Sequence, residues 1–463
     1  MTTDNADIAI VGAGPAGMAA AIEAKSSKVI VLDDQAMPGG QIWRSVEDVA
    51  ARNDLHIFGK DYHRGLRHVQ KFRASGVQYR QQARVIGVED WETGSGSDLI
   101  YLHDGKVKRL SAQRLIIATG AYERPTPFPG WTLPGVMSAG AAQIALKSTN
   151  MVPKRPFVLA GQGPLFLLLA SQLRAAGTPP DVILQLDDPK RVKHALLHLP
   201  AALTGIQDLL KGVCWGLKIT NGTKISVKNV INLEAHGEKQ LERISWKTQN
   251  GVVGECPAST LLIHDGVIPN TQLLRAMRAP IWYDDKEAAW RPSLASIAGQ
   301  MSDRPWIYAA GDVSGIGGWR AAVAMGTLAG ASANYTLGKG TIGNSEEMRS
   351  LGRGKALRPF LNALYPPARA FKKPANSTTI CRCEEVTAGE IRKAVREGAQ
   401  GPNQMKAFLR CGMGPCQGRM CADKTVELIA ESNCTPINEV LPMRVRMPIS
   451  PVTLGEMSSL DKR

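Results

Sequence analysis

Short apolar runs that end in glycine-rich loops recur along the first two thirds of the chain. Residues 7–11 (DIAIV) lead into the loop GAGPAG at 12–17, which is followed by a helix-like stretch and a second apolar run at 29–34. Residues 157–166 (FVLAGQGPLF) and 306–322 (WIYAAGDVSGIGGWRAA) repeat this change from strand to glycine to helix. Short strands that alternate with helices predict an α/β fold built on parallel sheets.

The first glycine loop has the spacing of a dinucleotide-binding unit. In such a unit the first glycine permits a tight turn, the second lets a pyrophosphate approach the backbone, and the third lets the helix pack on the sheet. Gly12, Gly14 and Gly17 occupy these positions. An acid at the end of the next strand binds a ribose hydroxyl. Asp33 fits this position better than Asp34, but the sequence leaves the choice between them open.

The second glycine unit departs from this pattern. Phe166 stands where the third glycine would be, and the next strand-like run has Gln185 near its end instead of a clear acid. A domain that no longer binds a nicotinamide dinucleotide is therefore at least as well supported as a working one.

Periodicity is lost at residues 341–379, where Pro, Lys and Arg accumulate. We interpret this stretch as a linker with one short helix around 357–364. Beyond it, the segment TAGEIRKAVREGA predicts a helix with Thr387 as N-cap and Glu390 at the capping-box position. The chain ends in a tail rich in Pro and Met.

Composition excludes several classes of protein. The 463 residues are 44% hydrophobic and carry a formal charge of +15, but aromatics are only 5% and no basic run is interleaved with them, so we expect no nucleic-acid partner. The longest apolar stretch, residues 157–173, is broken by glycine and proline, so no stable membrane span is expected. The first residues lack a basic region, which argues against a secretory signal. We therefore expect a cytoplasmic protein.

Cysteine is distributed unevenly. Five of the eight cysteines fall between residues 381 and 421, and clustered thiols in a reducing compartment suggest a metal site. The segments CRCEEV and CGMGPCQGRMC resemble the [2Fe-2S] domain related to bacterioferritin-associated ferredoxin. Structural zinc sites seldom use a C-x-C pair, so an iron–sulfur cluster is favoured over zinc. The expected ligands are Cys381, Cys383, Cys411 and Cys416.

Two further features of this segment bear on the cluster. Gly412 and Gly414 free the backbone to direct N–H groups toward the sulfide of a cluster, which tunes its potential. Cys421 comes after the expected start of a helix, so we interpret it as a packed core thiol and not as a ligand.

Four motifs in order, GAGPAG, PGGQ at 38–41, ATG at 118–120 and AAGD at 309–312, resemble the two-dinucleotide-domain flavoproteins, which include thioredoxin reductases and glutathione reductase. The resemblance implies an FAD domain interrupted by a second Rossmann-like domain. For Asp312 it implies a bond to the ribityl and phosphate region; a helix N-cap is the alternative. The residues that the resemblance assigns to FAD are Gly12, Gly14, Pro15, Ala16, Gly17, Asp33, Asp34, Gly39, Gly40, Gln41, Val85, Thr119, Gly120, Gly311 and Asp312.

The chain departs from disulfide reductases of that family at one decisive point. IWRS follows PGGQ, and the segment GVMSAGAAQ also lacks cysteine, so no redox CxxC lies at either expected place. Thioredoxin-reductase chemistry is therefore excluded.

The segment ATGAYERPTPFPGWTLPGVMSAGAAQ, the cysteine cluster and the Pro-rich tail resemble one narrower group, the A (alpha) subunits of heteromeric amine dehydrogenases. These include opine (octopine or nopaline) oxidases, hydrogen cyanide synthase, and proline or hydroxyproline dehydrogenases. The resemblance implies a glycine-oxidase-like β subunit that oxidises the substrate, a small ferredoxin-like γ subunit, an external electron acceptor, and room for FMN at a subunit interface. This chain would transfer electrons and carry no catalytic residue.

Three alternatives remain beside the opine interpretation. The first is the equivalent subunit of hydrogen cyanide synthase or of proline or hydroxyproline dehydrogenase. The second is a stand-alone NAD(P)H:acceptor reductase with a fused ferredoxin domain, and the third is a zinc-stabilised interaction subunit with a vestigial flavin fold. The expected domains are an FAD-binding domain at 1–150 and 286–340, an inserted NAD(P)-binding-like domain at 151–285, the linker at 341–379, a BFD-like domain at 380–432 and a tail at 433–463.

Overall fold

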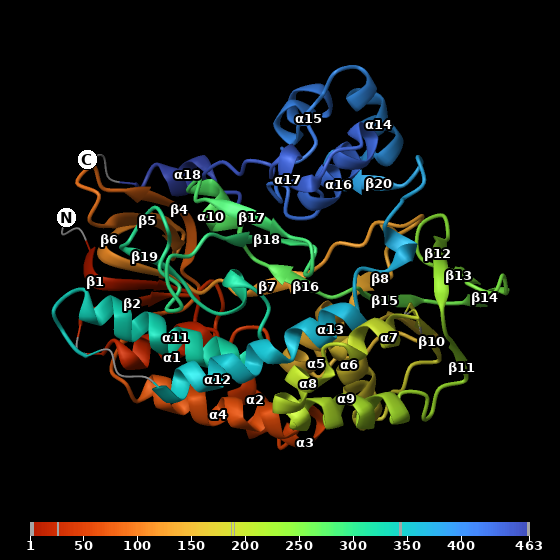
Figure 1. Ribbon diagram of the computed structural model, residues 1–463, viewed down its shortest axis with the longest axis horizontal. Helices are drawn as coiled ribbons and strands as arrows, with labels where there is room; N and C mark the ends of the chain where they lie inside the picture. The colour runs from red at the N-terminus through yellow and green to blue at the C-terminus, as the bar shows by residue number, and fades with distance from the viewer. Residues whose placement is uncertain (1–3, 26, 187, 189, 342–344, 461–463) are drawn as a thin grey trace.

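The computed structural model describes residues 4–25, 27–186, 188, 190–341 and 345–460. Two sheets form the centres of its two larger units (Figure 1). The first sheet has the order β3-β2-β1-β6-β5-β4, with β19 also paired to β6. Its strands are β1 (Asp4–Val11), β2 (Val29–Leu32), β3 (Gln78–Arg80), β4 (Arg84–Asp90), β5 (Ser97–His103), β6 (Lys106–Ile117) and β19 (Ile307–Ala309).

The inner part of the first sheet is parallel, as the alternation of strands and helices predicted. Strand β1 pairs in parallel with β2 and β6, and all four residues of β2 are buried. Helices α1 (Pro15–Glu23) and α11 (Gly318–Tyr335) pack together on one face (Figure 1). Burial of these strands explains why they are continuous apolar runs.

The second sheet is parallel throughout, in the order β11-β10-β9-β15-β8. Strand β8 precedes residue 150 but belongs to this sheet, so by strand pairing the inserted unit begins earlier than the sequence suggested. The chain crosses between the two units at an antiparallel pair, β7 with β16. These strands are β7 (Ala121–Glu123), β8 (Val136–Ser138), β9 (Phe157–Gly161), β10 (Val182–Gln185), β11 (Ile225–Val227), β15 (Thr260–His264) and β16 (Val267–Pro269).

The expected linker contains more structure than the sequence indicated. Helix α13 (Arg358–Leu364) is the short helix that was expected, but α12 (Ser345–Ala356) precedes it. The polar sequence of α12 gave no sign of Leu351, which is 1% exposed and packs against apolar residues of α11.

The C-terminal domain is small and mostly helical, and it lies at the top of Figure 1. Thr387 and Glu390 form the capping box predicted for its first helix. The core of this domain includes Tyr283 and Trp290, which come from a hairpin of the FAD-type unit. Its elements are β20 (Thr379–Cys381), β21 (Val386–Thr387), α14 (Ala388–Arg396), α15 (Pro402–Leu409), α16 (Ala422–Asn433) and α17 (Ile437–Val440), packed on β17 (Ile281–Asp284) and β18 (Ala289–Pro292).

The tail returns from the small domain to the first sheet. The Ile449 amide donates to the Ile86 carbonyl at 2.9 Å, and the Ser459 hydroxyl accepts from the Val107 amide at 2.8 Å. The tail therefore fastens the C-terminal domain to β4 and β6. In the described part of the chain, no helix has the length and apolar character needed to cross a membrane.

Glycine permits the close packing of α1 on α11. A Cβ atom at Gly326 would overlap the carbonyl oxygen of Ala16, and one at Gly330 would overlap that of Ala20. The two glycines are four residues apart, so they lie on one face of α11.

We expect Gly326→Ala to lower the free energy of unfolding by about 3 kcal/mol, because backbone atoms on both sides cannot move apart without disturbing the sheet. Thermal unfolding followed by circular dichroism measures this. Gly216→Ala is the matched control: this helical glycine has open space around its Cβ position, so the change should leave stability equal or raised by up to about 1 kcal/mol. Equal melting temperatures of Gly326→Ala and the wild type would contradict the close approach of α11 to α1.

Candidate functional site

The first glycine loop has the geometry expected of a pyrophosphate cradle. Gly12 has φ +102°, and a Cβ there would lie 2.5 Å from the Ala118 carbonyl oxygen, while a Cβ at Gly17 would overlap the carbonyl of Gly12. At Gly14, by contrast, the nearest atom to a Cβ is the Gly40 Cα at 3.7 Å. Packing inside the protein thus requires Gly12 and Gly17, whereas the space beside Gly14 is free for a ligand.

The structure separates the two candidate acids. Asp33 is 5% exposed, and its carboxylate accepts hydrogen bonds from the amides of Ala13 at 2.9 Å and Gln35 at 3.0 Å. Burial, the largest cause, raises the pKa of Asp33 to about 6. Asp34 is exposed, and its side chain pairs with that of Gln35. Asp33 is therefore the acid that faces the glycine loop.

The PGGQ loop packs directly against the first glycine loop. The Gly39 amide donates to the Ala13 carbonyl at 2.8 Å, and a Cβ at Gly40 would lie 2.9 Å from the Gly14 Cα. Lys147 of α5 (Ala139–Thr149) fixes this loop by hydrogen bonds, and nothing in the sequence indicated that role. Its Nζ donates to the carbonyls of Gln41 and Ile42, both at 3.0 Å.

Lys147 is 2% exposed, and burial lowers its pKa to about 7. Its Nζ also donates to Gln143 Oε1 at 3.1 Å. A lysine near the end of a helix is ordinarily solvated, so only the packed structure identifies this one as an anchor.

Thr119 and Gly120 lie between β6 and β7, and Val85 is the second residue of β4. Thr119 Oγ1 donates to the Asn270 carbonyl at 3.0 Å, and the Gly120 carbonyl accepts from the Asn270 amide at 2.9 Å. Val85 is buried in β4, two residues after Ala83, whose amide donates to the Asp33 carbonyl.

Gly311 and Asp312 lie between β19 and the start of α11. A Cβ at Gly311 would lie 2.8 Å from the Ala16 Cβ. Asp312 Oδ1 accepts from the amides of Gly317 at 2.9 Å and Gly318 at 3.3 Å, and burial raises its pKa. The carboxylate thus binds the first amides of α11 beside the glycine loop, although the N-cap residue of that helix is Gly317 and not Asp312.

A second group that sequence reasoning missed is Arg358 at the start of α13. Its Nε is buried without a hydrogen bond and lies 3.7 Å from Glu287 Oε1. Burial lowers its pKa, while the charges of Glu287 and Asp312 oppose that effect. An arginine in a segment rich in Lys and Arg carries no signal in the sequence that separates it from its solvated neighbours.

The second glycine loop is covered by the protein itself. Gln162 Nε2 donates to Asp265 Oδ1 at 2.8 Å and to the Pro366 carbonyl at 2.6 Å, and a Cβ at Gly163 would meet the ring of Tyr365 at 3.9 Å. Phe166 is 2% exposed and fills the core at the position of the missing glycine.

The five clustered cysteines fall into two groups in space. The sulfurs of Cys381, Cys411 and Cys421 lie within 4.8 Å of one another, and all three residues are buried. Contacts with the thiols of Cys411 and Cys421 lower the pKa of Cys381 to about 2. Cys383 is exposed and contacts Cys416. The Gly412 amide contacts the Cys381 sulfur.

The position expected for Cys421, beyond the start of a helix, is wrong. Helix α16 begins at Ala422, so Cys421 is its N-cap residue and does not lie beyond its start. From that position its sulfur turns into the same space as Cys381 and Cys411. It is buried, as expected, but among thiols.

One short segment joins the two sites. Asn270, which is bonded to the Thr119–Gly120 turn, precedes α10 (Gln272–Ala276). Gln272 Nε2 donates to the Gln417 carbonyl in the cysteine loop at 3.4 Å, and Arg275 pairs with Asp423 at 3.0 Å.

Comparisons with known protein families agree with the division of the chain into a larger part with two sheets and a small C-terminal domain. The model of the Pyridine nucleotide-disulphide oxidoreductase family matches residues 6–326, and that of the BFD-like [2Fe-2S] binding domain matches residues 379–431. The crystal structure of L-proline dehydrogenase from P. horikoshii has a TM-score of 0.72 at 18% identity, over 99% of this chain and 80% of that one. The shared fold is a two-Rossmann flavoprotein with a C-terminal BFD-like domain.

Several relatives match from end to end. The A subunit of opine oxidase from Rhizobium meliloti (strain 1021) is 38% identical over 98% of both chains, and that from Agrobacterium tumefaciens (strain Ach5) is 38% identical over 99% of this chain and 92% of its own. Hydrogen cyanide synthase subunit HcnB of Pseudomonas aeruginosa is 32% identical over 97% of this chain and 98% of its own. The chain belongs to the family of opine oxidase A subunits, which are subunits of FAD-dependent oxidoreductases.

Proposed function

We propose that this chain is the electron-transfer subunit of a heteromeric amine dehydrogenase that oxidises the C–N bond of an opine, octopine or nopaline, to an amino acid and a 2-keto acid. Substrate oxidation takes place in a glycine-oxidase-like β subunit, and a small ferredoxin-like γ subunit is a further component. The observation that carries the proposal is the end-to-end identity of 38% with opine oxidase A subunits.

The described residues support a role in electron transfer more than a role in substrate chemistry. FAD supplies a carrier that exchanges electrons singly or in pairs, and a [2Fe-2S] cluster exchanges one at a time. No cysteine precedes Cys214 in the chain, so a dithiol has no place beside the first glycine loop. The segment from Asn270 to Arg275 contacts both the strand ends of the flavin domain and the cysteine loop.

This chain's own residues hold the flavin domain in shape. Gly14 leaves room for the pyrophosphate, and Asp33 presents its carboxylate beside the glycine loop for the ribose. Lys147 donates hydrogen bonds to carbonyls of the PGGQ loop and its neighbour, and Asp312 accepts hydrogen bonds from the first amides of α11. An FMN at a subunit interface is part of the proposal and depends on the partner subunit.

For the cluster we propose four ligands among the five cysteines. Each iron of a [2Fe-2S] cluster takes two thiolates. The pair formed by the exposed Cys383 and the half-buried Cys416 supplies two, and the buried trio supplies the other two. The Cys411 sulfur lies 3.3 Å from the Thr425 hydroxyl, a hydrogen bond of the kind that a ligating thiolate also makes. We therefore propose Cys381 and Cys411 as the second pair, in line with the sequence, and Cys421 as the neighbouring thiol that could replace Cys411.

Single Cys→Ser variants test this assignment, because an alkoxide replaces thiolate poorly. Variants of Cys381, Cys383, Cys411 and Cys416 should lose iron and the S = 1/2 signal of the reduced protein, whereas Cys421→Ser should keep about two irons per chain. Iron analysis and electron paramagnetic resonance after anaerobic purification measure both. Retention by Cys411→Ser with loss in Cys421→Ser would replace Cys411 by Cys421 in the ligand set. One zinc and no iron per chain in the wild type would rule out electron transfer through an iron–sulfur cluster.

Flavin binding has a clean test at Gly14. Gly14→Val should abolish FAD binding without unfolding the protein, since the new side chain enters the ligand space while its Cβ meets no protein atom closer than 3.7 Å. The flavin released on denaturation and the melting temperature are the two readouts. A variant that keeps full FAD would overturn the assignment of the loop.

NADH and NADPH should reduce the flavin slowly or not at all. Phe166 fills the place of a packing glycine, and Tyr365 and Pro366 cover the second glycine loop. Anaerobic stopped-flow mixing with either nucleotide, followed by flavin absorbance, measures the rate. Rapid stoichiometric bleaching would favour the stand-alone reductase instead.

The proposed function as a whole is tested by co-expression with a glycine-oxidase-like subunit from the same organism. Purified complex should reduce an artificial dye with octopine or nopaline, and this chain alone should not. Proline, hydroxyproline and glycine serve as comparison substrates, because the related A subunits belong to enzymes of different substrates. Cluster-free cysteine variants that keep FAD should still assemble but lose dye reduction. Activity with proline and not with an opine would contradict the proposed substrate, but it would not contradict the proposed role of this chain in electron transfer.

A further inference from the structure

Arg358, at the start of α13, carries a guanidinium whose hydrogen-bonding capacity the protein itself leaves unused. Its Nε is enclosed and makes no hydrogen bond, and the Oε1 atom of its ion-pair partner Glu287 lies 3.7 Å away, beyond hydrogen-bond length. Within the described part of the chain, its terminal nitrogens have no hydrogen-bond partner either. A guanidinium has five N–H donors, and charged donors that stay unsatisfied lower stability. The side chain therefore has the capacity to bind a ligand.

Three other arginines show that this state is unusual. Among the described residues, the Nε atoms of Arg44, Arg109 and Arg124 are also enclosed without a hydrogen bond. In each of them the terminal nitrogens are used: Arg44 donates to two glutamine side chains, Arg109 to two carboxylates and Arg124 to two backbone carbonyls. Arg358 differs from all three in the free end of its side chain.

Arg358 lies beside the loop that leads into α11. Glu287, with which it pairs, accepts from the Ile316 amide in that loop at 3.5 Å. Burial raises the pKa of Asp312 in the same loop, and the nearby charge of Arg358 is one of the effects that oppose it. Two observations thus place the guanidinium next to the loop that was assigned to FAD.

The order of the strands shows which end of a dinucleotide this loop receives. The pyrophosphate belongs at the glycine loop after β1, and Asp33, the acid for the adenosine ribose, follows β2 on one side of β1. The loop with Asp312 follows β19, which pairs with β6 on the other side of β1. A dinucleotide with its adenosine toward β2 extends its other half toward β6 and β19. In FAD that half carries the flavin, so Arg358 lies at the flavin end of the site.

We propose that Arg358 is a flavin-binding residue, whose guanidinium faces the pyrimidine part of the isoalloxazine ring and stabilises the reduced flavin. Reduction adds two electrons and one proton to the neutral ring and leaves one negative charge near N1 and the C2 carbonyl. A fixed cation there binds reduced flavin more tightly than oxidised flavin, which raises the midpoint potential. This role rests on the flavin binding proposed above and not on the identity of the amine that supplies the electrons.

The position of Arg358 in the chain sets it apart from the motifs of the flavoprotein fold. The family model of the two-dinucleotide flavoproteins matches residues 6–326, and Arg358 lies beyond them, in the stretch that the sequence indicated as a linker. Helix α13 thus brings a cation to a site that the glycine motifs leave without one. The stretch between the flavin domain and the cysteine domain would then be part of the flavin site.

Arg358→Gln in the full-length, FAD-loaded chain tests this role. A charged donor is worth more to an anion than to a neutral acceptor, so affinity should fall about threefold for oxidised FAD and about 30-fold for reduced FAD. The tenfold difference between the two lowers the midpoint potential by about 30 mV. Anaerobic spectroelectrochemistry with dithionite as reductant measures the potential, and titration of flavin-free protein with FAD measures the affinity. Arg358→Lys, which keeps the charge but not the planar fork, should recover about half of the shift.

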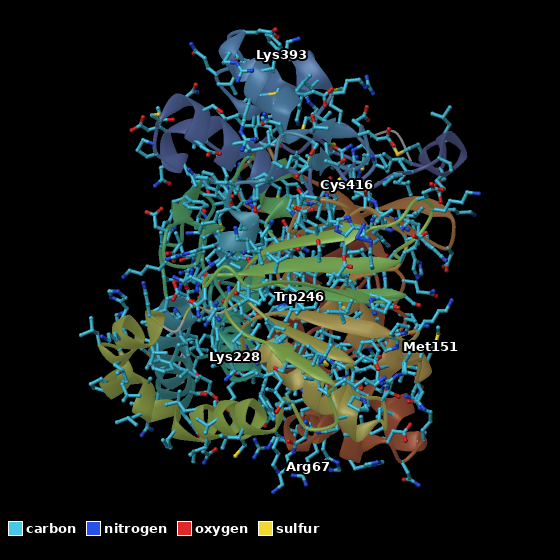
Figure 2. The ribbon with its side chains drawn as sticks, turned by 90° about the vertical axis from the view of Figure 1, so that its right-hand side faces the viewer. Arg67, Met151, Lys228, Trp246, Lys393 and Cys416 are labelled. Carbon is cyan, nitrogen blue, oxygen red and sulfur yellow. The ribbon has the colours of Figure 1, made fainter. Side chains whose placement is uncertain are left out.

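Arg109→Gln is the matched control. Arg109 also belongs to the flavin domain and has an enclosed Nε, but it pairs with Glu89 and Asp98 near the beginning of β6, away from the loop before α11. Its loss should lower the melting temperature and leave the flavin potential unchanged. The iron–sulfur cluster gives an internal reference, because Figure 2 places Cys416 in the small domain, whereas α13 lies with the two larger units. The midpoint of the S = 1/2 signal should be the same in all variants.

Glu287→Gln keeps the test decisive if Arg358→Gln fails to fold or to hold FAD. Removal of the negative charge beside Arg358 should favour reduced flavin about threefold, which raises the midpoint potential by roughly 15 mV. A wild-type potential in FAD-loaded Arg358→Gln, or an unchanged or lowered potential in Glu287→Gln, would overturn the role of Arg358 and leave the flavin site intact. Absence of FAD from the wild-type chain would instead contradict the flavin site itself.

Discussion

The close approach of backbone to backbone around Ala16 is the constraint on which the flavin domain depends. Gly326 of α11 meets the Ala16 carbonyl, and Gly311 brings the end of β19 against the Ala16 side chain. In the same place the first turn of α1 closes on Gly12 through Gly17. A side chain at any of these glycines would separate strands whose ends must converge for a dinucleotide to be bound. The glycine motifs of the sequence therefore converge on one small volume.

This convergence explains why the flavin domain was predictable. The glycine spacing is fixed by sterics that hold in any protein of this fold, so Gly12, Gly14 and Gly17 could be identified before the structure was known. The choice between Asp33 and Asp34 could not, because one residue of difference in strand length turns the side chain to the other face of the sheet. Lys147 and Arg358 were beyond sequence reasoning for another reason: burial of a cation depends on packing partners that are far away in the chain.

The cysteine domain shows the limit of spacing as evidence. The sequence grouped Cys411 with Cys416, but the turn between them separates their sulfurs and gives Cys411 to the buried trio. Cys421 was set aside because a helix was expected to contain it, yet its place at the N-cap of α16 leaves its side chain free to turn back. A shift of one helix boundary by a residue or two, which is the usual error of such predictions, was enough to hide that its sulfur lies beside those of Cys381 and Cys411.

The tail contacts both the cysteine loop and the flavin-domain sheet. The Met443 sulfur fills the space that side chains at Gly412 and Gly418 would need, and the Met447 sulfur lies against Gly87 in β4 and accepts from the Val88 amide at 3.1 Å. Two methionines four residues apart thus contact the loop that carries Cys411 and the strand that carries Val85. Methionine is flexible and fills irregular gaps, which suits it to the packing between the two domains. The Pro- and Met-rich composition of the tail, which had no assigned role in the sequence, is accounted for as the strap that holds the cysteine domain against the flavin domain.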